Sequence, residues 1–322
     1  MPYSRRETIS RSVPPMDNIT REVQSLIISS MAYSSWKTYK TAVDALHTFR
    51  LLFNLENIWS VSIDTIAHFI GYLSLKGFAA STVTTYISAL SHVHKMGNLI
   101  DNTKSVIVSK MLKGLRRKNP KTRDIRVPIS LKLLKRLIVS LQKVCTSRYE
   151  IFLFSVAFSI AFFGMLRVSE VTIKSRSDKV GHTLNFENVS FQKVEAQTVL
   201  RVLLEISKTD QNHKSVTLVI HKQQDSDICP IQLLQSYLAV RFSGVNGSRK
   251  LFVHFDGSGL TCFQFCSVLQ KCLRFCNVPL HIRIHSFRIG RATDLAKNGG
   301  DEETIKQCGR WSSKSYLRYI RL

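Results

Sequence analysis

The stretch HSFRIGR, residues 285–291, places a histidine and an arginine three positions apart at the start of an expected helix. At this spacing His285 and Arg288 lie on one helical face. The first turn of a helix also presents unpaired backbone N–H groups, which attract anions. The stretch therefore predicts a phosphate-binding position in which Arg288 completes the cradle. A single His-x-x-Arg pattern is weak evidence, so the segments around it have to be considered together with it.

Arg167 and Glu170 directly follow the apolar run at residues 151–166. This run is too short to span a membrane, which takes about 20 residues, and is better interpreted as a buried helix. An arginine that leaves a buried helix needs a partner. The ordinary explanation is a structural ion pair between Arg167 and Glu170 across one helical turn. The functional alternative is a guanidinium held ready for an anion.

Other candidate residues are ordinary when they are taken one at a time. Lys208 lies in a turn between two alternating, β-branched segments, where lysine is common. Trp311 lies two positions after Gly309, and tryptophan is more often a core residue than a catalytic one. Tyr316 and Tyr319 lie three apart on the last expected helix, so both could face the same side. The order of all these residues along the chain is more informative than any one of them.

In that order and spacing the chain resembles the tyrosine recombinases, the lambda-integrase-type enzymes. It is most similar to the recombinases of eukaryotic DIRS/Ngaro retroelements and Crypton transposons. Their catalytic ends look like the segments HSFRIG, GRW and YIR, found here at 285–290, 309–311 and 319–321. The resemblance covers residues 21–322, and includes STVTTYISAL at 81–90. It implies a helical core-binding domain and a catalytic domain that cuts and rejoins DNA without metal, nucleotide or other cofactor.

The resemblance also implies a role for each matching residue. Arg167 and Arg288 would clamp the non-bridging oxygens of the scissile phosphate, which suits a bidentate, always charged guanidinium. Tyr319, within the shared YIR ending, would attack phosphorus and form a 3′-phosphotyrosine. Lys208 would protonate the leaving 5′-oxygen, and Glu170 would orient the other groups.

Two further residues complete the implied catalytic set. His285 would hydrogen-bond the phosphate and assist proton movement near neutral pH. The indole N–H of Trp311 would donate to the phosphate. Arg291 departs from the family pattern, because close relatives often have a small residue at that position. The eight positions from Trp311 to Tyr319 are one fewer than in many bacterial members.

Composition supports a polyanionic partner. Lys and Arg number 46 against 22 Asp and Glu, giving a net charge of +24. Double-stranded DNA is the expected partner, because neutralising its phosphates releases counterions. An anionic membrane is the competitor, but no lipidation motif or basic amphipathic anchor is found. The start of the chain is polar rather than a signal peptide, so we expect the nucleus in a eukaryote and the cytoplasm otherwise.

The pattern of apolar residues predicts two domains in a mainly α fold with a small antiparallel β-sheet (α+β). Residues 1–20 are expected to form a flexible arm, 21–112 a core-binding domain of about four helices, 113–126 a basic linker, and 127–322 the catalytic domain. Segments 198–206 and 215–220 predict a hairpin. Further helices are expected at 130–145, 149–165, 230–242, 261–276, 286–297, 302–307 and 313–321. In the linker, the residues expected to contact DNA phosphates are Lys113, Arg116, Arg117 and Lys118. The resemblance also implies a homo-oligomer, a tetramer, on the DNA.

The cysteines do not predict a metal site. Cys262, Cys266, Cys272 and Cys276 fall in one expected helix, which cannot easily surround a tetrahedral ion. We interpret them as ordinary core residues.

Three rival functions remain open at this level. A nicking-closing topoisomerase of type IB uses similar chemistry, and a domesticated DNA-binding protein would keep the fold and charge without activity. A metal-dependent transposase needs clustered carboxylates, and none stands out.

Overall fold

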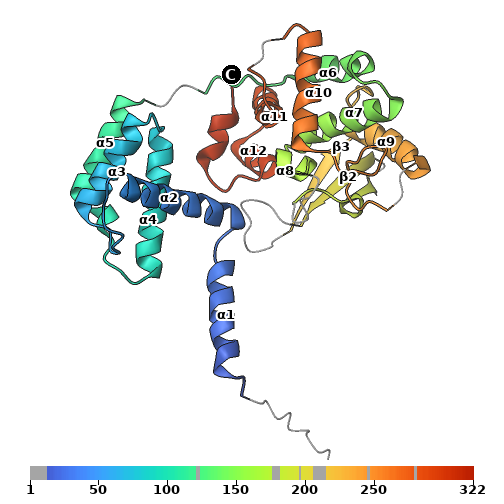
Figure 1. Ribbon diagram of the computed structural model, residues 1–322. Coiled ribbons are helices and arrows are strands. Elements are labelled where there is room, and N and C mark those ends of the chain that lie inside the picture. The colour runs from blue at the N-terminus through green and yellow to red at the C-terminus, as the bar shows by residue number, and fades with distance from the viewer. Residues whose placement is uncertain are drawn as a thin grey trace, which may run out of the picture. The chain divides into compact units, whose positions relative to one another are not determined.

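The computed structural model describes residues 13–120, 124–175, 182–195, 197–205, 215–244, 247–278 and 281–322. The chain divides into two compact units, residues 1–123 and 124–322 (Figure 1). Helices dominate both, and the second unit holds a small antiparallel sheet. The expected fold class is therefore confirmed.

The N-terminal unit is helical throughout its described part. Its core is formed by α2 to α5 around buried residues such as Leu46, Phe69 and Leu90. His94 lies in this core, accepting from the N–H of Val61 at 3.0 Å through Nε2. The helix bounds are α1 Met16–Ser29, α2 Tyr33–Leu52, α3 Ile63–Leu75, α4 Ala80–Met96, the short 3-10 helix η1 Asn102–Lys104, and α5 Val106–Lys118.

Two expectations about this unit were wrong. The arm was expected to reach residue 20, but α1 begins at Met16 and buries no side chain. The linker was expected to begin at Lys113, but α5 continues to Lys118. Ser105 caps the start of α5, and buried Leu115 continues its apolar face through the basic run. Positive charge in the last turn of a helix is favourable, so the basic residues at 113–118 belong to α5 rather than to the linker.

The C-terminal unit is built around α7 (Arg148–Phe163), which is buried on nearly every side. Helices α6, α9 and α11 pack against it. The bounds of the other helices are α6 Leu131–Val144, α8 Val168–Val171, η2 Phe186–Asn188, α9 Pro230–Gly244, α10 Cys262–Phe275, α11 His285–Lys297, α12 Glu302–Gly309 and the 3-10 helix η3 Lys314–Tyr319. The segment expected to close the chain as an α-helix over 313–321 is thus a shorter 3-10 helix.

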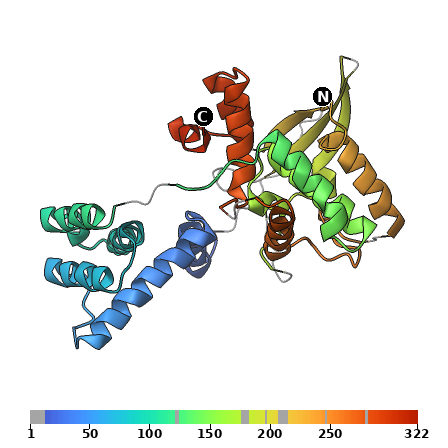
Figure 2. The same ribbon diagram turned by 90° about the horizontal axis from the view of Figure 1, so that it is seen from above.

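Three antiparallel strands lie in the order β1-β2-β3, with β1 Val189–Val194, β2 Gln197–Leu204 and β3 Val216–His221. The pairing of β2 with β3 confirms the predicted hairpin strands. In both views the strands lie beside α9 (Figures 1 and 2). Strand β1 was not predicted, because most of its residues are exposed and show no apolar alternation.

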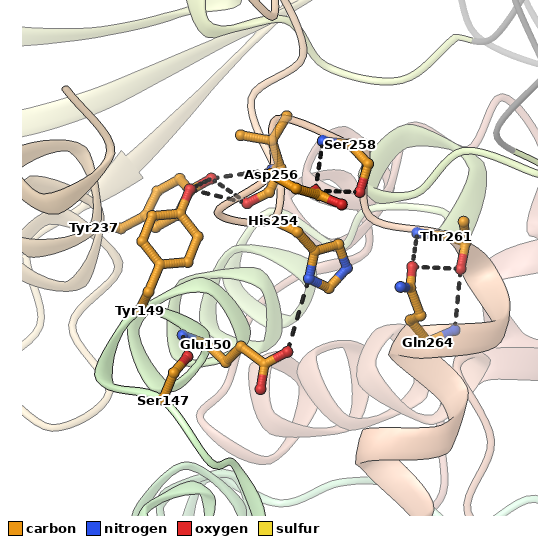
Figure 3. Close-up of polar contacts among 10 residues, drawn as sticks. Ser147, Tyr149, Glu150, Tyr237, His254, Asp256, Ser258, Thr261 and Gln264 are labelled. Atoms are coloured by element: carbon orange, nitrogen blue, oxygen red, sulfur yellow. Dashed lines mark hydrogen bonds and ion pairs between the residues drawn. The ribbon is translucent and has the colours of Figure 1, made fainter. Parts of the chain in front are cut away.

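Two tyrosines fasten α7 and α9 to the segment that leads into α10 (Figure 3). The hydroxyl of Tyr149 donates to the carbonyl of Val253 at 3.0 Å, and the N–H of Val253 donates to Tyr237 at 3.0 Å. Nearby, Nδ1 of His254 lies 3.8 Å from the Glu150 carboxylate. These contacts satisfy buried polar groups at the end of α7 opposite to Gly164.

The cysteines expected in the core divide into two pairs. Cys272 and Cys276 are buried in the core of the C-terminal unit. Cys262 and Cys266, on the same helix, are only half-buried, so for them the expectation was wrong.

Gly290 is expected to be intolerant of substitution. A Cβ there would collide with the backbone of Ile129, whose N–H donates to the carbonyl of Ser286 at 3.1 Å. Gly290→Ala should therefore lower the free energy of unfolding by about 1–3 kcal/mol, as overpacking does. Urea unfolding measures this. Gly114→Ala is the control, since nothing lies within 4 Å of its Cβ and alanine favours helix. Equal stability of both variants would contradict the close approach.

Candidate active site

The segment after α7 places Arg167 and Glu170 at the start of α8. Gly164 ends α7, and Met165 adopts a left-handed backbone with φ 46°. The N–H of Arg167 donates to Oε2 of Glu170 at 2.7 Å, and its Nη1 lies 3.1 Å from Oε1. The ordinary explanation of this pair, a structural ion pair, is thus met. It does not exclude the functional one, because other cations meet at the same carboxylate.

Arg288 is buried in α11, with 2% of its surface exposed. Its Nη1 donates to the carbonyl of Met165, and its Nη2 donates to the carbonyl of Gly309 at 2.9 Å. One guanidinium therefore joins the end of α7 to the end of α12. Burial lowers the pKa of Arg288 to about 10, and the charges of Arg310 and Arg167 act in the same direction. The group remains a cation at neutral pH.

Arg310 is a site residue that the sequence interpretation missed. It ends α12 in a left-handed conformation, φ 57° and ψ 49°. Nη1 lies 2.9 Å from Oε1 of Glu170, and Nη2 lies 2.9 Å from Oε2. Nη2 also donates to the carbonyl of Met165 at 3.2 Å. The available signal was a basic residue just after a helix-ending glycine, but sequence spacing does not show that its side chain turns inward.

The rings of Trp311 and Tyr319 stack beside Arg288. Their centroids lie 4.8 Å apart, and the Arg288 guanidinium carbon lies 5.0 Å from the Trp311 centroid and 5.6 Å from that of Tyr319. Glycine is required at position 309, because a Cβ there would collide with the Trp311 ring. The arrangement brings a phenol next to a buried cation.

The hydroxyl of Thr293, on α11, fixes the backbone around Tyr319. It donates to the carbonyl of Tyr319 at 3.3 Å and accepts from the N–H of Arg321 at 3.0 Å. The guanidinium of Arg321 also lies 3.0 Å from the Asp124 carboxylate. Tyr319 therefore follows the position of α11, which carries Arg288.

The remaining two predicted catalytic residues are not placed among these contacts. His285 is the first residue of α11, one turn before Arg288, and its side chain is exposed. Lys208 lies outside the described residues, as does the rest of the predicted turn at 207–212 between β2 and β3. The structure thus brings together Arg167, Arg288, Trp311 and Tyr319, together with Glu170.

The charges around Arg288 favour an anion. The guanidiniums of Arg310 and Arg167 and the carboxylate of Glu170 all act on it, so cations outnumber the carboxylate. Burial acts to raise the pKa of Glu170, but the hydrogen bonds and charges of Arg310 and Arg167 outweigh it and lower that pKa. Glu170 is therefore ionised. The buried Nε atoms of Arg288 and Arg310 have no hydrogen-bond partner among the described residues.

Two features are absent from the part of the chain that the structure describes. No group of three or more His, Cys, Asp or Glu side chains is placed to hold a metal ion. No described helix is long and apolar enough to cross a membrane.

No protein-family model matches the chain, and no curated protein matches it by sequence. Solved structures do match. The XerH site-specific recombinase bound to palindromic difH has a TM-score of 0.64 and 18% identity, over 88% of this chain and 75% of that one. The Tn1549 transposon integrase with transposon right end DNA has a TM-score of 0.60 and 15% identity, over 91% and 90%. A lambda integrase dimer bound to a core site has a TM-score of 0.59 and 13% identity, over 95% of this chain and 77% of that one. The protein therefore has the tyrosine-recombinase fold.

Proposed function

We propose that the protein is a tyrosine-type DNA recombinase, which cleaves and rejoins DNA strands through a 3′-phosphotyrosyl intermediate. The observation that supports this most is the stacking of Tyr319 and Trp311 beside the buried Arg288, next to Arg167 and Arg310. A phenol against an anion-attracting cluster has the parts needed for nucleophilic attack on a phosphodiester.

In this reaction the oxygen of Tyr319 bonds to phosphorus while the bond from phosphorus to the 5′-oxygen breaks. Arg167 and Arg288 would stabilise the charge that develops on the non-bridging oxygens, and Trp311 would donate its indole N–H. The phenol proton leaves with help from His285, and Lys208 gives a proton to the 5′-oxygen. The phosphotyrosyl bond keeps the energy of the broken bond, so a 5′-hydroxyl can reverse the step without ATP.

A nicked suicide duplex tests the proposal most directly. Cleavage next to the nick releases a short fragment, so the covalent complex cannot be reversed and accumulates. We expect an adduct that resists denaturation and forms equally well in EDTA. A pure wild-type chain that binds DNA but forms no adduct would support an inert, domesticated DNA-binding protein instead. Relaxation of supercoils by a monomer, without strand exchange, would support a type IB topoisomerase-like enzyme.

The finer parts of the proposal concern the biological role. The motifs at 285–290, 309–311 and 319–321 favour a recombinase that mobilises a transposable element of the DIRS/Ngaro or Crypton kind. Exchange between two duplexes requires several active sites, so we propose a homo-oligomer on double-stranded DNA, with four subunits. No cofactor enters the proposed reaction. In a eukaryotic host the enzyme would work in the nucleus.

DNA binding is expected to weaken steeply as salt rises. Lys113, Arg116, Arg117 and Lys118 are all exposed near the end of α5. Neutralising these four residues should make the slope of log K against log salt shallower by about 0.9 for each lost phosphate contact. Sequence preference should not change, because phosphate contacts carry no base information. Titrations of fluorescent duplex at several salt concentrations measure both, and an unchanged slope would show that this end of α5 does not contact DNA.

Lys208 is expected to act as the general acid for the leaving oxygen. Lys208→Ala should cleave ordinary DNA slowly but recover on a substrate with sulfur at the 5′-bridging position, because a thiolate leaves without a proton. Arg167→Ala is the matched control and should not recover, since its task is charge stabilisation. Single-turnover adduct formation on both substrates measures the rescue. Equal slowing of Lys208→Ala on both would remove Lys208 from this role.

A further inference from the structure

The Glu170 carboxylate is shared between two arginines from distant parts of the chain. Arg167 approaches it within its own segment, at 3.1 Å, and Arg310 approaches it from the end of α12 with 2.9 Å to each oxygen. Only 1% of the Glu170 side chain and 8% of the Arg310 side chain are exposed. A contact this buried is screened little by solvent and leaves few alternative geometries.

Arg310 also shares a hydrogen-bond acceptor with Arg288. Arg310 Nη2 donates to the carbonyl of Met165, which also accepts from Arg288. Arg310 is therefore bonded to the partner of Arg167 and to the backbone anchor of Arg288. Its terminal nitrogens are engaged by protein oxygens, so in this geometry it holds other groups rather than contacting a phosphate.

The backbone at Arg310 favours the same conclusion. A left-handed conformation costs a residue other than glycine of order 1 kcal/mol, and it persists only where surrounding contacts require it. Here the conformation lets the side chain return to Glu170 while the next residue, Trp311, lies against Arg288. Met165, whose carbonyl accepts from both Arg288 and Arg310, is left-handed as well.

We infer that Arg310 is a positioning residue for strand cleavage, which holds Glu170 so that Arg167 keeps the geometry in which it would meet the scissile phosphate. This inference rests on the proposed function. Without Arg310, the buried Glu170 carboxylate would be compensated mainly by Arg167, and the Arg167 guanidinium would be drawn toward it. The clamp would lose its geometry although both of its arginines remain.

The test compares cleavage, DNA affinity and folding in the same variants. Arg310→Asn removes the guanidinium but keeps a residue that tolerates the left-handed backbone. At a temperature where the variant is fully folded, we expect the single-turnover adduct rate at saturating DNA to fall about 100-fold, with a nearly unchanged Kd. The melting temperature should fall, because the buried Glu170 carboxylate loses one partner. Arg310→Lys should not restore the rate, because one ammonium cannot bridge both carboxylate oxygens and a carbonyl.

The decisive variant is the double substitution Arg310→Asn with Glu170→Gln. It removes the charge that would draw Arg167 away, so its adduct rate should exceed that of Arg310→Asn alone. Arg291→Ala is the matched control. Arg291 lies on α11, and its Nη1 is 2.7 Å from the carboxylate of Asp294 rather than being bonded to Glu170. It should cleave like the wild type.

Three results would overturn the inference. They are an unchanged rate in Arg310→Asn, a loss of rate explained entirely by weaker DNA binding or by an unfolded fraction at the assay temperature, and a double variant no faster than the single one. Absence of an adduct with the wild-type chain would instead contradict the proposed function. The two failures are distinguishable, because the first is measured relative to the wild-type rate and the second is the wild-type rate itself.

Discussion

Replacing Tyr319 with phenylalanine is expected to abolish the covalent protein–DNA adduct while leaving folding and DNA affinity nearly intact. The substitution removes one oxygen and keeps the ring that stacks on Trp311 at 4.8 Å. The rate should therefore fall below detection because no other oxygen replaces the nucleophile, while the melting temperature stays close to that of the wild type. Denaturing gels of the suicide-substrate reaction measure the first quantity, and thermal denaturation measures the second.

Tyr316 is the matched control, because it lies three residues away in the same 3-10 helix. Its ring is buried with 7% exposed, as is typical of a packing residue. Burial raises the pKa of Tyr316, and the nearby Glu302 carboxylate raises it further, which opposes formation of a phenolate. Tyr316→Phe should keep the adduct. Peptide mapping that finds the phosphate on Tyr316 would contradict our assignment.

Replacing Arg288 with alanine is expected to damage both chemistry and stability. Loss of one preorganised donor at a developing charge typically costs about 100- to 1,000-fold in rate. The carbonyl of Gly309 would lose the Arg288 guanidinium, and that of Met165 would keep only Arg310. A buried group left unpaired costs about 1–3 kcal/mol. Single-turnover adduct rates and urea unfolding measure the two effects.

Arg288→Lys separates these effects, since lysine keeps the charge but cannot bond both carbonyls in the fixed fork of a guanidinium. It should recover part of the stability and little of the rate. Arg291→Ala, one turn further along α11, removes an ion pair with Asp294 and a contact with the Phe163 ring, but no contact of the candidate site. Its adduct rate should stay close to that of the wild type. A rate for Arg288→Lys equal to that of the wild type would show that charge alone is sufficient.

The elements predicted best are those whose own pattern determines them. The run at 151–166 is apolar on all sides, and it forms the buried helix at the centre of the C-terminal unit. Strands β2 and β3 were predicted because their apolar residues alternate. Strand β1 buries little of its own, so no periodic burial marked it in the sequence. Only the first turn of α1, before residue 21, lay outside the segment expected to be helical. The end of α5 was assigned to the linker because its basic residues outnumber the one buried apolar residue, Leu115, that continues the helix.

The candidate site shows the same division. Arg167, Arg288 and Tyr319 were predicted from their order along the chain, and the structure places them around one cluster of contacts. Arg310 was missed because its role depends on a left-handed turn that sends its side chain back to Glu170. Chain order does not encode such a turn, and Arg310 lies 140 positions from Glu170.

The hydroxyl of Thr293 has a consequence for any assembly of several copies. By bonding on both sides of Tyr319, it keeps the phenol with the Arg288 of its own chain. In the proposed reaction, each subunit would then supply its own nucleophile together with its own phosphate-binding arginines, rather than placing its tyrosine in the site of a neighbour. Contacts between copies would determine when a subunit cleaves, and each strand would be cleaved by residues of a single chain.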